Sequence, residues 1–378
     1  MLFHHGWPFL LFIVIQRRLL YFTTASFQIL PRIYEKVKYH VKYNHYHSCM
    51  SFIYEGQPLS MRKWHLFLIL VILSVISLFV GDTNISVSEV LRLELTERQL
   101  QVFFVSRVPR LITILIAGAS LSIAGLIMQK LSQNSFVSPT TAGTMESAKL
   151  GILISMLLFA SSGLLVKMSL AFIFSLLGTF IFMKILNHIR YKDVVFVPLV
   201  GLMFGGIISS IATFIAYKHD LIQNISSWLM GDFSMVLAGR YELMYLSIPL
   251  MIIAYLYANQ FSIAGMGEDF AKNLGLKYKQ VVNIGLAIVA MITACVILTV
   301  GMIPFLGLIV PNIVSLYRGD NLRDTLPYTA LLGAIVILAC DIIGRILIAP
   351  AEIPISVTIG ILGSTVFIWL LFKKASTS

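Results

Sequence analysis

Between Gln280 and Tyr317 the chain runs for 38 residues without an Asp, Glu, Lys or Arg. A soluble domain cannot bury so long a segment, whereas a bilayer solvates it, and a spanning helix needs only about 20 apolar residues. Two glycines and two prolines interrupt the run, which therefore predicts two spans joined by a tight turn: Gly301, Pro304, Gly307 and Pro311. Similar runs recur along most of the chain and predict an integral membrane protein.

Composition and charge agree with a membrane protein. Hydrophobic residues make up 58% of the chain and charged residues 12%, where a soluble domain has about 25% charged residues. The net charge of +11 comes from cationic residues clustered in short loops between apolar runs. That pattern orients membrane proteins. Because no basic stripe interleaved with aromatic residues is present, the sequence argues against nucleic-acid binding.

From Met61 onward the hydropathy predicts an all-α polytopic protein with ten spans. Their approximate bounds are Trp64–Val80, Leu111–Gln129, Gly143–Val166, Met168–Met183, Val194–Tyr217, Leu243–Phe261, Gln280–Val300, Phe305–Tyr317, Thr325–Ile348 and Ile353–Phe372. The Lys and Arg bias of the short loops predicts that both termini are cytoplasmic. Small residues within spans predict close helix packing: Gly118, Gly125, Gly201 and Gly205.

The first sixty residues differ from the rest. They hold five of the eight histidines, and the apolar piece Trp7–Ile15 is too short to span. The segment that starts at Met61 has a cationic start followed by a span, which is typical of a protein of the inner membrane. We interpret residues 1–60 as an atypical N-terminal extension, either an artefact of start-site choice or dispensable, and residues 61–378 as the membrane domain.

Four motifs occur in a fixed order along the membrane domain. They read SRVPRL at 106–111, QNSFVSPTTAG at 133–143, GMGEDFAKNLGL at 265–276, and FLGLIVPN at 305–312 with APAEIPI at 349–355. In this order and spacing they resemble the permease subunits of the iron-siderophore and vitamin B12 ABC importers. The resemblance covers about Trp64 to Lys374.

The resemblance implies a type II ABC importer permease fold with ten transmembrane helices, in the cytoplasmic membrane. Its implied partners are a second permease (a copy of this chain or a paralogue), two cytoplasmic ATPase subunits and an external binding protein. The chain has no GxxxxGK[ST] phosphate loop, so ATP would be bound by the partner subunit. No cofactor, metal site or enzymatic activity is expected in this chain.

The third motif lies in the loop between the sixth and seventh spans. We predict a short amphipathic helix there, with Gly275 as its left-handed C-terminal cap. An ordinary surface helix is the alternative. The matching segment of the family couples the permease to the ATPase, which assigns this role to Gly267, Glu268, Phe270, Ala271, Leu274 and Gly275.

Three arginines are candidates for docking the binding protein. Arg107 and Arg110 are three residues apart, so a helix places them on one face, and Arg345 lies near the outer end of the ninth span. In the B12-type permeases, arginines at the matching positions meet acidic residues of the binding protein. The alternatives are snorkelling to the interface for the first two and an ion pair with Asp341 for Arg345.

Charged residues inside spans are functional candidates by default. Glu146 and Lys149 lie near the start of the third span, at its cytoplasmic end, and either act in function or simply pair with each other. The run TMESAKLG, which contains them, resembles the siderophore branch more than the B12 branch, so a ferric siderophore is the expected cargo. An ion-coupled secondary transporter that uses Glu146, Lys149 and Asp341 as a relay is the alternative function.

Overall fold

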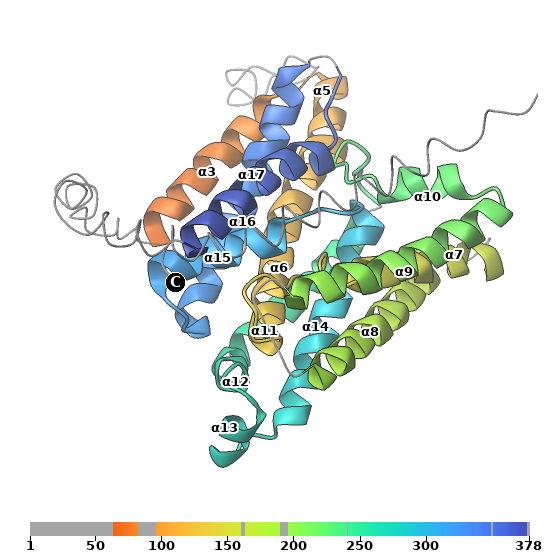
Figure 1. Cartoon of the computed structure of the whole chain (residues 1–378). Coiled ribbons are helices and arrows are strands. Elements are labelled where there is room, and N and C mark those ends of the chain that lie inside the picture. The colour runs from red at the N-terminus through yellow and green to blue at the C-terminus, as the bar shows by residue number, and fades with distance from the viewer. Residues whose placement is uncertain are drawn as a thin grey trace, which may run out of the picture. The chain divides into compact units, whose positions relative to one another are not determined.

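The computed structural model describes residues 63–81, 96–159, 163–189, 196–239, 241–348 and 351–375. The interpretation of residues 1–60 concerns a segment outside these ranges and stays a prediction. The described part is nearly all helical, and its β structure is one isolated bridge between Met230 and Met302. The prediction of an all-α protein is confirmed (Figure 1).

The helices follow one another along the chain with these bounds: α3 (Lys63–Phe79), α5 (Glu97–Val102), the π-turn η1 (Phe103–Arg107), α6 (Val108–Leu131), α7 (Thr144–Leu158), α8 (Leu164–His188), α9 (Phe196–Lys218), α10 (Ile222–Leu229), the 3-10 turn η2 (Glu242–Leu246), α11 (Ser247–Leu256), α12 (Ala258–Ala264), α13 (Glu268–Asn273), α14 (Tyr278–Thr299), α15 (Leu306–Arg318), α16 (Leu322–Leu347) and α17 (Ile355–Ala375).

Each of the ten predicted apolar segments overlaps a helix, but the helices differ in length. Within the described ranges, five helices are long and apolar enough to cross a membrane, and the bent pair from Glu242 to Ala264 makes a sixth. The remaining segments form shorter helices: α3, α7, α15 and α17. The structure confirms a multi-pass helical bundle, and ten complete crossings stay a prediction.

Two predictions about the spans are wrong. The third span ends at Leu158, and Val166 belongs to α8. The sixth span is broken by a 62° bend at Tyr257, a position without the Gly or Pro that would have indicated a break. The long uncharged run does divide at Gly301 and Pro304, as predicted, whereas Pro311 lies inside α15.

Helix α6 runs through the centre of the bundle and is covered on almost every side (Figure 1). At Gly125 it meets the backbone of Gly307 in α15, and at Gly118 it meets Gly333 and Ala334 in α16. A Cβ atom on Gly125 would come within 1.9 Å of the Gly307 carbonyl oxygen. The small residues therefore allow the backbones to approach closely, as the sequence predicted.

A Gly125→Val substitution is expected to destabilise the bundle by about 1–3 kcal/mol or more, because α6 and α15 must move apart. The measurement is the thermal unfolding of the detergent-solubilised protein, followed by size-exclusion chromatography. Gly163→Ala is the control, since a Cβ at Gly163 meets nothing within 4 Å. Equal stability of the two variants would contradict the close helix contact.

Candidate functional sites at the ends and centre of the bundle

The two ends of α6 define two separate sites. Its 24 residues correspond to about 36 Å at 1.5 Å per residue. The N-terminal end of α6 carries Arg110 and lies beside the C-terminal end of α16, whereas its C-terminal end lies beside α12 and the segment leading to α13. Figure 1 shows α5 and α13 at opposite ends of the bundle.

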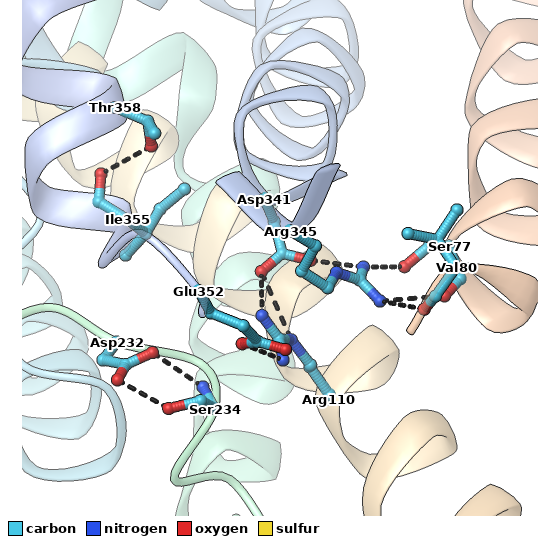
Figure 2. A network of polar contacts seen from close by, with 10 residues as sticks. All are labelled: Ser77, Val80, Arg110, Asp232, Ser234, Asp341, Arg345, Glu352, Ile355 and Thr358. Atoms are coloured by element: carbon cyan, nitrogen blue, oxygen red, sulfur yellow. Dashed lines mark hydrogen bonds and ion pairs between the residues drawn. The ribbon is translucent and has the colours of Figure 1, made fainter. Parts of the chain in front are cut away.

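An ion-pair cluster occupies the N-terminal end of α6 (Figure 2). Asp341 of α16 lies between Arg110 of α6 and Arg345, one turn further along α16. Arg110 Nη2 is 2.7 Å from Asp341 Oδ1, and Arg110 Nη1 is 2.8 Å from Oε2 of Glu352. The ion pair between Arg345 and Asp341, which the sequence offered as the alternative to docking, is present.

Two of the arginines also hold the C-terminal end of α3. Arg345 Nη1 donates to the carbonyl oxygens of Ser77 and Val80, each at 3.0 Å, and Arg107 Nη1 donates to that of Leu78 at 2.7 Å. The last carbonyls of a helix lack partners within it and carry its partial negative charge. Helix α3 has no basic residue in its own last turn, so these two guanidinium groups from other helices supply the missing donors.

The cluster is largely inside the protein. Arg107 and Arg345 are buried, the Arg110 side chain is 12% exposed and that of Glu352 is 30% exposed. Arg110 and Arg345 pair with the two carboxylates, and Arg107 lies beside them on the end of α3. Taken by themselves, these five side chains carry an excess of one positive charge. Sequence reasoning missed Glu352 as a member, because 242 residues separate it from Arg110 and no local spacing indicates the contact. Docking by the three arginines stays a prediction.

At the other end, the loop motif forms the short helix α13. Gly267 precedes it with φ at +109°, and Gly275 follows it with φ at +78°. The Leu276 N–H donates to the Ala271 carbonyl at 2.9 Å, and the Gly275 N–H donates to the Lys272 carbonyl at 2.9 Å. These two bonds are the Schellman arrangement, so the predicted glycine cap is confirmed.

The side chains of α13 divide into a buried and an open set. Ala271 is fully buried, whereas Phe270 is 49% exposed and Leu274 is 59% exposed. Glu268 forms a 2.8 Å ion pair with Lys272, and this hydrogen bond lowers the pKa of Glu268 and raises the pKa of Lys272. The helix and its C-terminal cap thus present Phe270 and Leu274 to solvent beside the ion pair of Glu268 with Lys272.

Glu146 and Lys149 lie on α7, beside α9. Lys149 Nζ donates to Ser209 Oγ at 3.1 Å and lies 3.9 Å from Glu146 Oε2, which has no hydrogen-bond partner within the described chain. Helix α9 begins at Phe196. The distance from Phe196 to Ser209 along the helix axis is about 20 Å. Glu146 thus lies in the first turn of α7, as predicted, and the pair packs beside the middle of α9. Its position at the cytoplasmic end stays a prediction.

A buried loop leads the chain to the position of Glu146 and Lys149 inside the bundle. After α6 ends at Leu131, residues 132–143 turn back into the bundle before α7 begins. Side chains satisfy the polar backbone of the loop: Asn312 Nδ2 donates to the Ser135 carbonyl at 2.6 Å, and the Ser138 N–H donates to Thr141 Oγ1 at 2.9 Å. Such a loop is tolerated at membrane depth only where protein covers it.

The apolar helices define a multi-pass membrane protein, and the comparisons with known proteins identify its family and its role as a permease. The FecCD transport family matches residues 69–373. The chain is 62% identical over 314 residues to the petrobactin import system permease protein YclN of Bacillus subtilis (strain 168), covering 83% of this chain and 99% of that protein. It is 40% identical over 307 residues to the petrobactin import system permease protein FatD of Bacillus anthracis, covering 81% of this chain and 90% of that protein.

A solved structure agrees with these relatives. An inward-facing metal-chelate-type ABC transporter superposes with a TM-score of 0.70 at 26% sequence identity, over 82% of this chain and 98% of that one. The chain belongs to the FecCD transport family, and its fold is that of an ABC importer permease.

Proposed function

We propose that this chain is the permease subunit through which an ABC importer carries a ferric siderophore across the cytoplasmic membrane. The observation that supports the cargo most is the 62% identity to a petrobactin permease over almost its whole length. The partners would be two cytoplasmic ATPase subunits, an external binding protein and a second permease. A copy of this chain and a paralogue are both compatible with that last role.

The open apolar side chains of α13 support an ATPase partner. A helix of six residues cannot be stable by itself, yet this one is capped at both ends by glycines at positive φ and keeps Phe270 and Leu274 exposed. Exposed apolar side chains held on a rigid element are typical of an interaction site. We assign Gly267, Glu268, Phe270, Ala271, Leu274 and Gly275 to coupling with the ATPase, which makes this end of the bundle cytoplasmic.

Uptake by the reconstituted importer tests the function. Proteoliposomes that contain the permease, the ATPase and the binding protein are expected to accumulate a ⁵⁵Fe-siderophore only when ATP is supplied on the ATPase side. An imposed proton or sodium gradient without ATP is expected to drive no uptake. Uptake driven by the gradient alone would instead support the ion-coupled secondary transporter.

The ion-pair cluster at the other end of α6 would meet the binding protein, since its excess positive charge complements acidic residues. The double change Arg107→Glu and Arg110→Glu is expected to weaken binding-protein affinity by roughly tenfold or more at low salt, and the difference should shrink as salt screens it. Titration of the labelled binding protein onto permease in nanodiscs measures this.

Because Arg107 also caps α3, the double-arginine variant could lose affinity through a folding defect. A second variant therefore distinguishes a loss of docking from a loss of folding. Glu352→Gln removes a half-buried negative charge and leaves the arginines in place. It should therefore tighten docking at low salt. Unchanged affinity in both the Glu352→Gln and the double-arginine variants would count against docking at this cluster.

A further inference from the structure

Three helices meet at a small buried cluster that has a cation on either side. The cluster consists of Leu66 of α3, Val314 of α15 and Tyr328 of α16. Lys63 begins α3 three residues before Leu66, and Arg318 ends α15 four residues after Val314. About one helical turn separates each cation from the cluster, so both charges lie at its edge. We call Lys63, Arg318 and Tyr328 the Tyr328 patch.

Both cations of the patch contact the same aromatic ring. Lys63 Nζ lies 5.6 Å from the ring centroid of Tyr328, and Arg318 Cζ lies 4.2 Å from it. Both distances are within the roughly 6 Å reach of a cation–π interaction. Arg318 Nη2 also donates to the Tyr328 hydroxyl. Tyr328 is buried, whereas Lys63 and Arg318 are exposed, so the structure holds two positive charges together on the surface although they repel each other.

The patch lies where two apolar helices end. After Lys63, α3 continues to Phe79 without another Asp, Glu, Lys or Arg, and α15 has none before Arg318. Charges are costly in hydrocarbon, and Tyr and Trp are enriched at the membrane surface, so the patch belongs at the level of the lipid headgroups. Asp320 lies two residues after Arg318 and pairs with Lys130 at the C-terminal end of α6, at 2.8 Å. The patch is therefore at the α13 end of the bundle.

An exposed apolar face of α3 continues from the patch toward the middle of the membrane. Phe67, Val71 and Val75 follow Lys63 at intervals of four residues, which places them along one side of the helix, and all three are exposed. Trp64 lies edge-on to Phe67, with ring centroids 6.3 Å apart. A ligand that fits both parts has an anionic group at the cations and an apolar body along α3. An anionic phospholipid has this form.

We propose that the Tyr328 patch binds the phosphate of an anionic phospholipid, whose acyl chains lie along this face of α3. A guanidinium group engages phosphate through two parallel hydrogen bonds, and an ammonium group supplies a point charge. Basic residues between helices at the membrane surface suit such headgroups. The bound anion offsets the repulsion between the two cations. That this leaflet is the cytoplasmic one rests on the proposed function, whereas the binding of lipid does not.

Native mass spectrometry of the full-length permease tests the lipid site. Phosphatidylglycerol is expected to bind the double variant Lys63→Gln with Arg318→Gln roughly thirtyfold more weakly than the unmodified chain, and either single variant about fivefold more weakly. Phosphatidylcholine, which has no net charge, should bind all of them equally. Lys167→Gln is the matched control, because Lys167 also lies over a ring, 5.0 Å from the centroid of Trp228, and its loss should leave phosphatidylglycerol binding unchanged. Equal phosphatidylglycerol binding by the unmodified chain and the double variant would overturn the proposal.

Thermal unfolding distinguishes a lipid site from a site for free anions. Phosphatidylglycerol should raise the unfolding temperature of the unmodified chain and leave that of the double variant unchanged, whereas inorganic phosphate should stabilise neither. Equal stabilisation by inorganic phosphate would overturn the lipid assignment. Lys63→Arg keeps the charge and should retain binding, so a loss as large as that of Lys63→Gln would also count against the proposal. These measurements use the permease alone, and failure of the proposed function would instead appear as absent uptake in the complete importer.

Discussion

Replacing Leu274 by Asp is expected to abolish ATP-driven uptake while the permease still inserts and folds. Leu274 is 59% exposed in the chain, so its loss removes little from the core, whereas a charge at the centre of a docking surface costs about 2 kcal/mol or more of binding energy. That corresponds to at least about a thirtyfold loss of ATPase affinity. Co-purification of the ATPase and ⁵⁵Fe uptake in the same membranes measure both effects.

Two further variants make this result specific. Asn273→Asp adds the same charge to the neighbouring exposed position and should leave uptake close to normal. Gly267→Pro should also abolish uptake, because it disturbs the N-terminal cap of α13. Proline fixes φ near −65°, whereas φ at position 267 is +109°. If the Leu274→Asp permease bound the ATPase and transported normally, α13 would be an ordinary surface helix and the coupling role would be lost.

Asp341→Asn is expected to destabilise the protein by about 3–5 kcal/mol, the usual cost of removing one partner from a buried ion pair. Asp341 is buried and is the carboxylate that Arg110 and Arg345 share. Without it, the two guanidinium groups would lose their shared carboxylate, and among the described residues Glu352, which is partly exposed, is the carboxylate that still pairs with Arg110. The expected result is a lower unfolding temperature and lower yield, measured by fluorescence-detected size-exclusion chromatography.

The control for this prediction is Glu352→Gln. Glu352 is 30% exposed and pairs with Arg110 alone, so its loss should cost about 1 kcal/mol or less. The double variant Asp341→Leu with Arg345→Met should recover part of the loss, because apolar replacement of a buried pair is often neutral. Equal unfolding temperatures for Asp341→Asn and Glu352→Gln would show that Asp341 does not hold this end together.

The local patterns were predicted well because their causes are local. The break near Gly301 and Pro304 and the glycine cap at Gly275 follow from backbone properties of single residues. The ion pair between Asp341 and Arg345 follows from their spacing of four residues on a helix. The bend at Tyr257 was missed because neither a Gly nor a Pro is present there.

The sequence by itself determined that this chain is a helical bundle in a bilayer. Long uncharged runs are stable as helices in the hydrocarbon layer, and a soluble domain cannot bury them. Only the tertiary structure decided which charges meet. Glu352 joins Arg110 across 242 residues, and two arginines from other helices cap α3. A buried return loop brings Glu146 and Lys149 beside Ser209 of α9. These are contacts between segments far apart in the chain, and hydropathy and spacing contain no information about such neighbours.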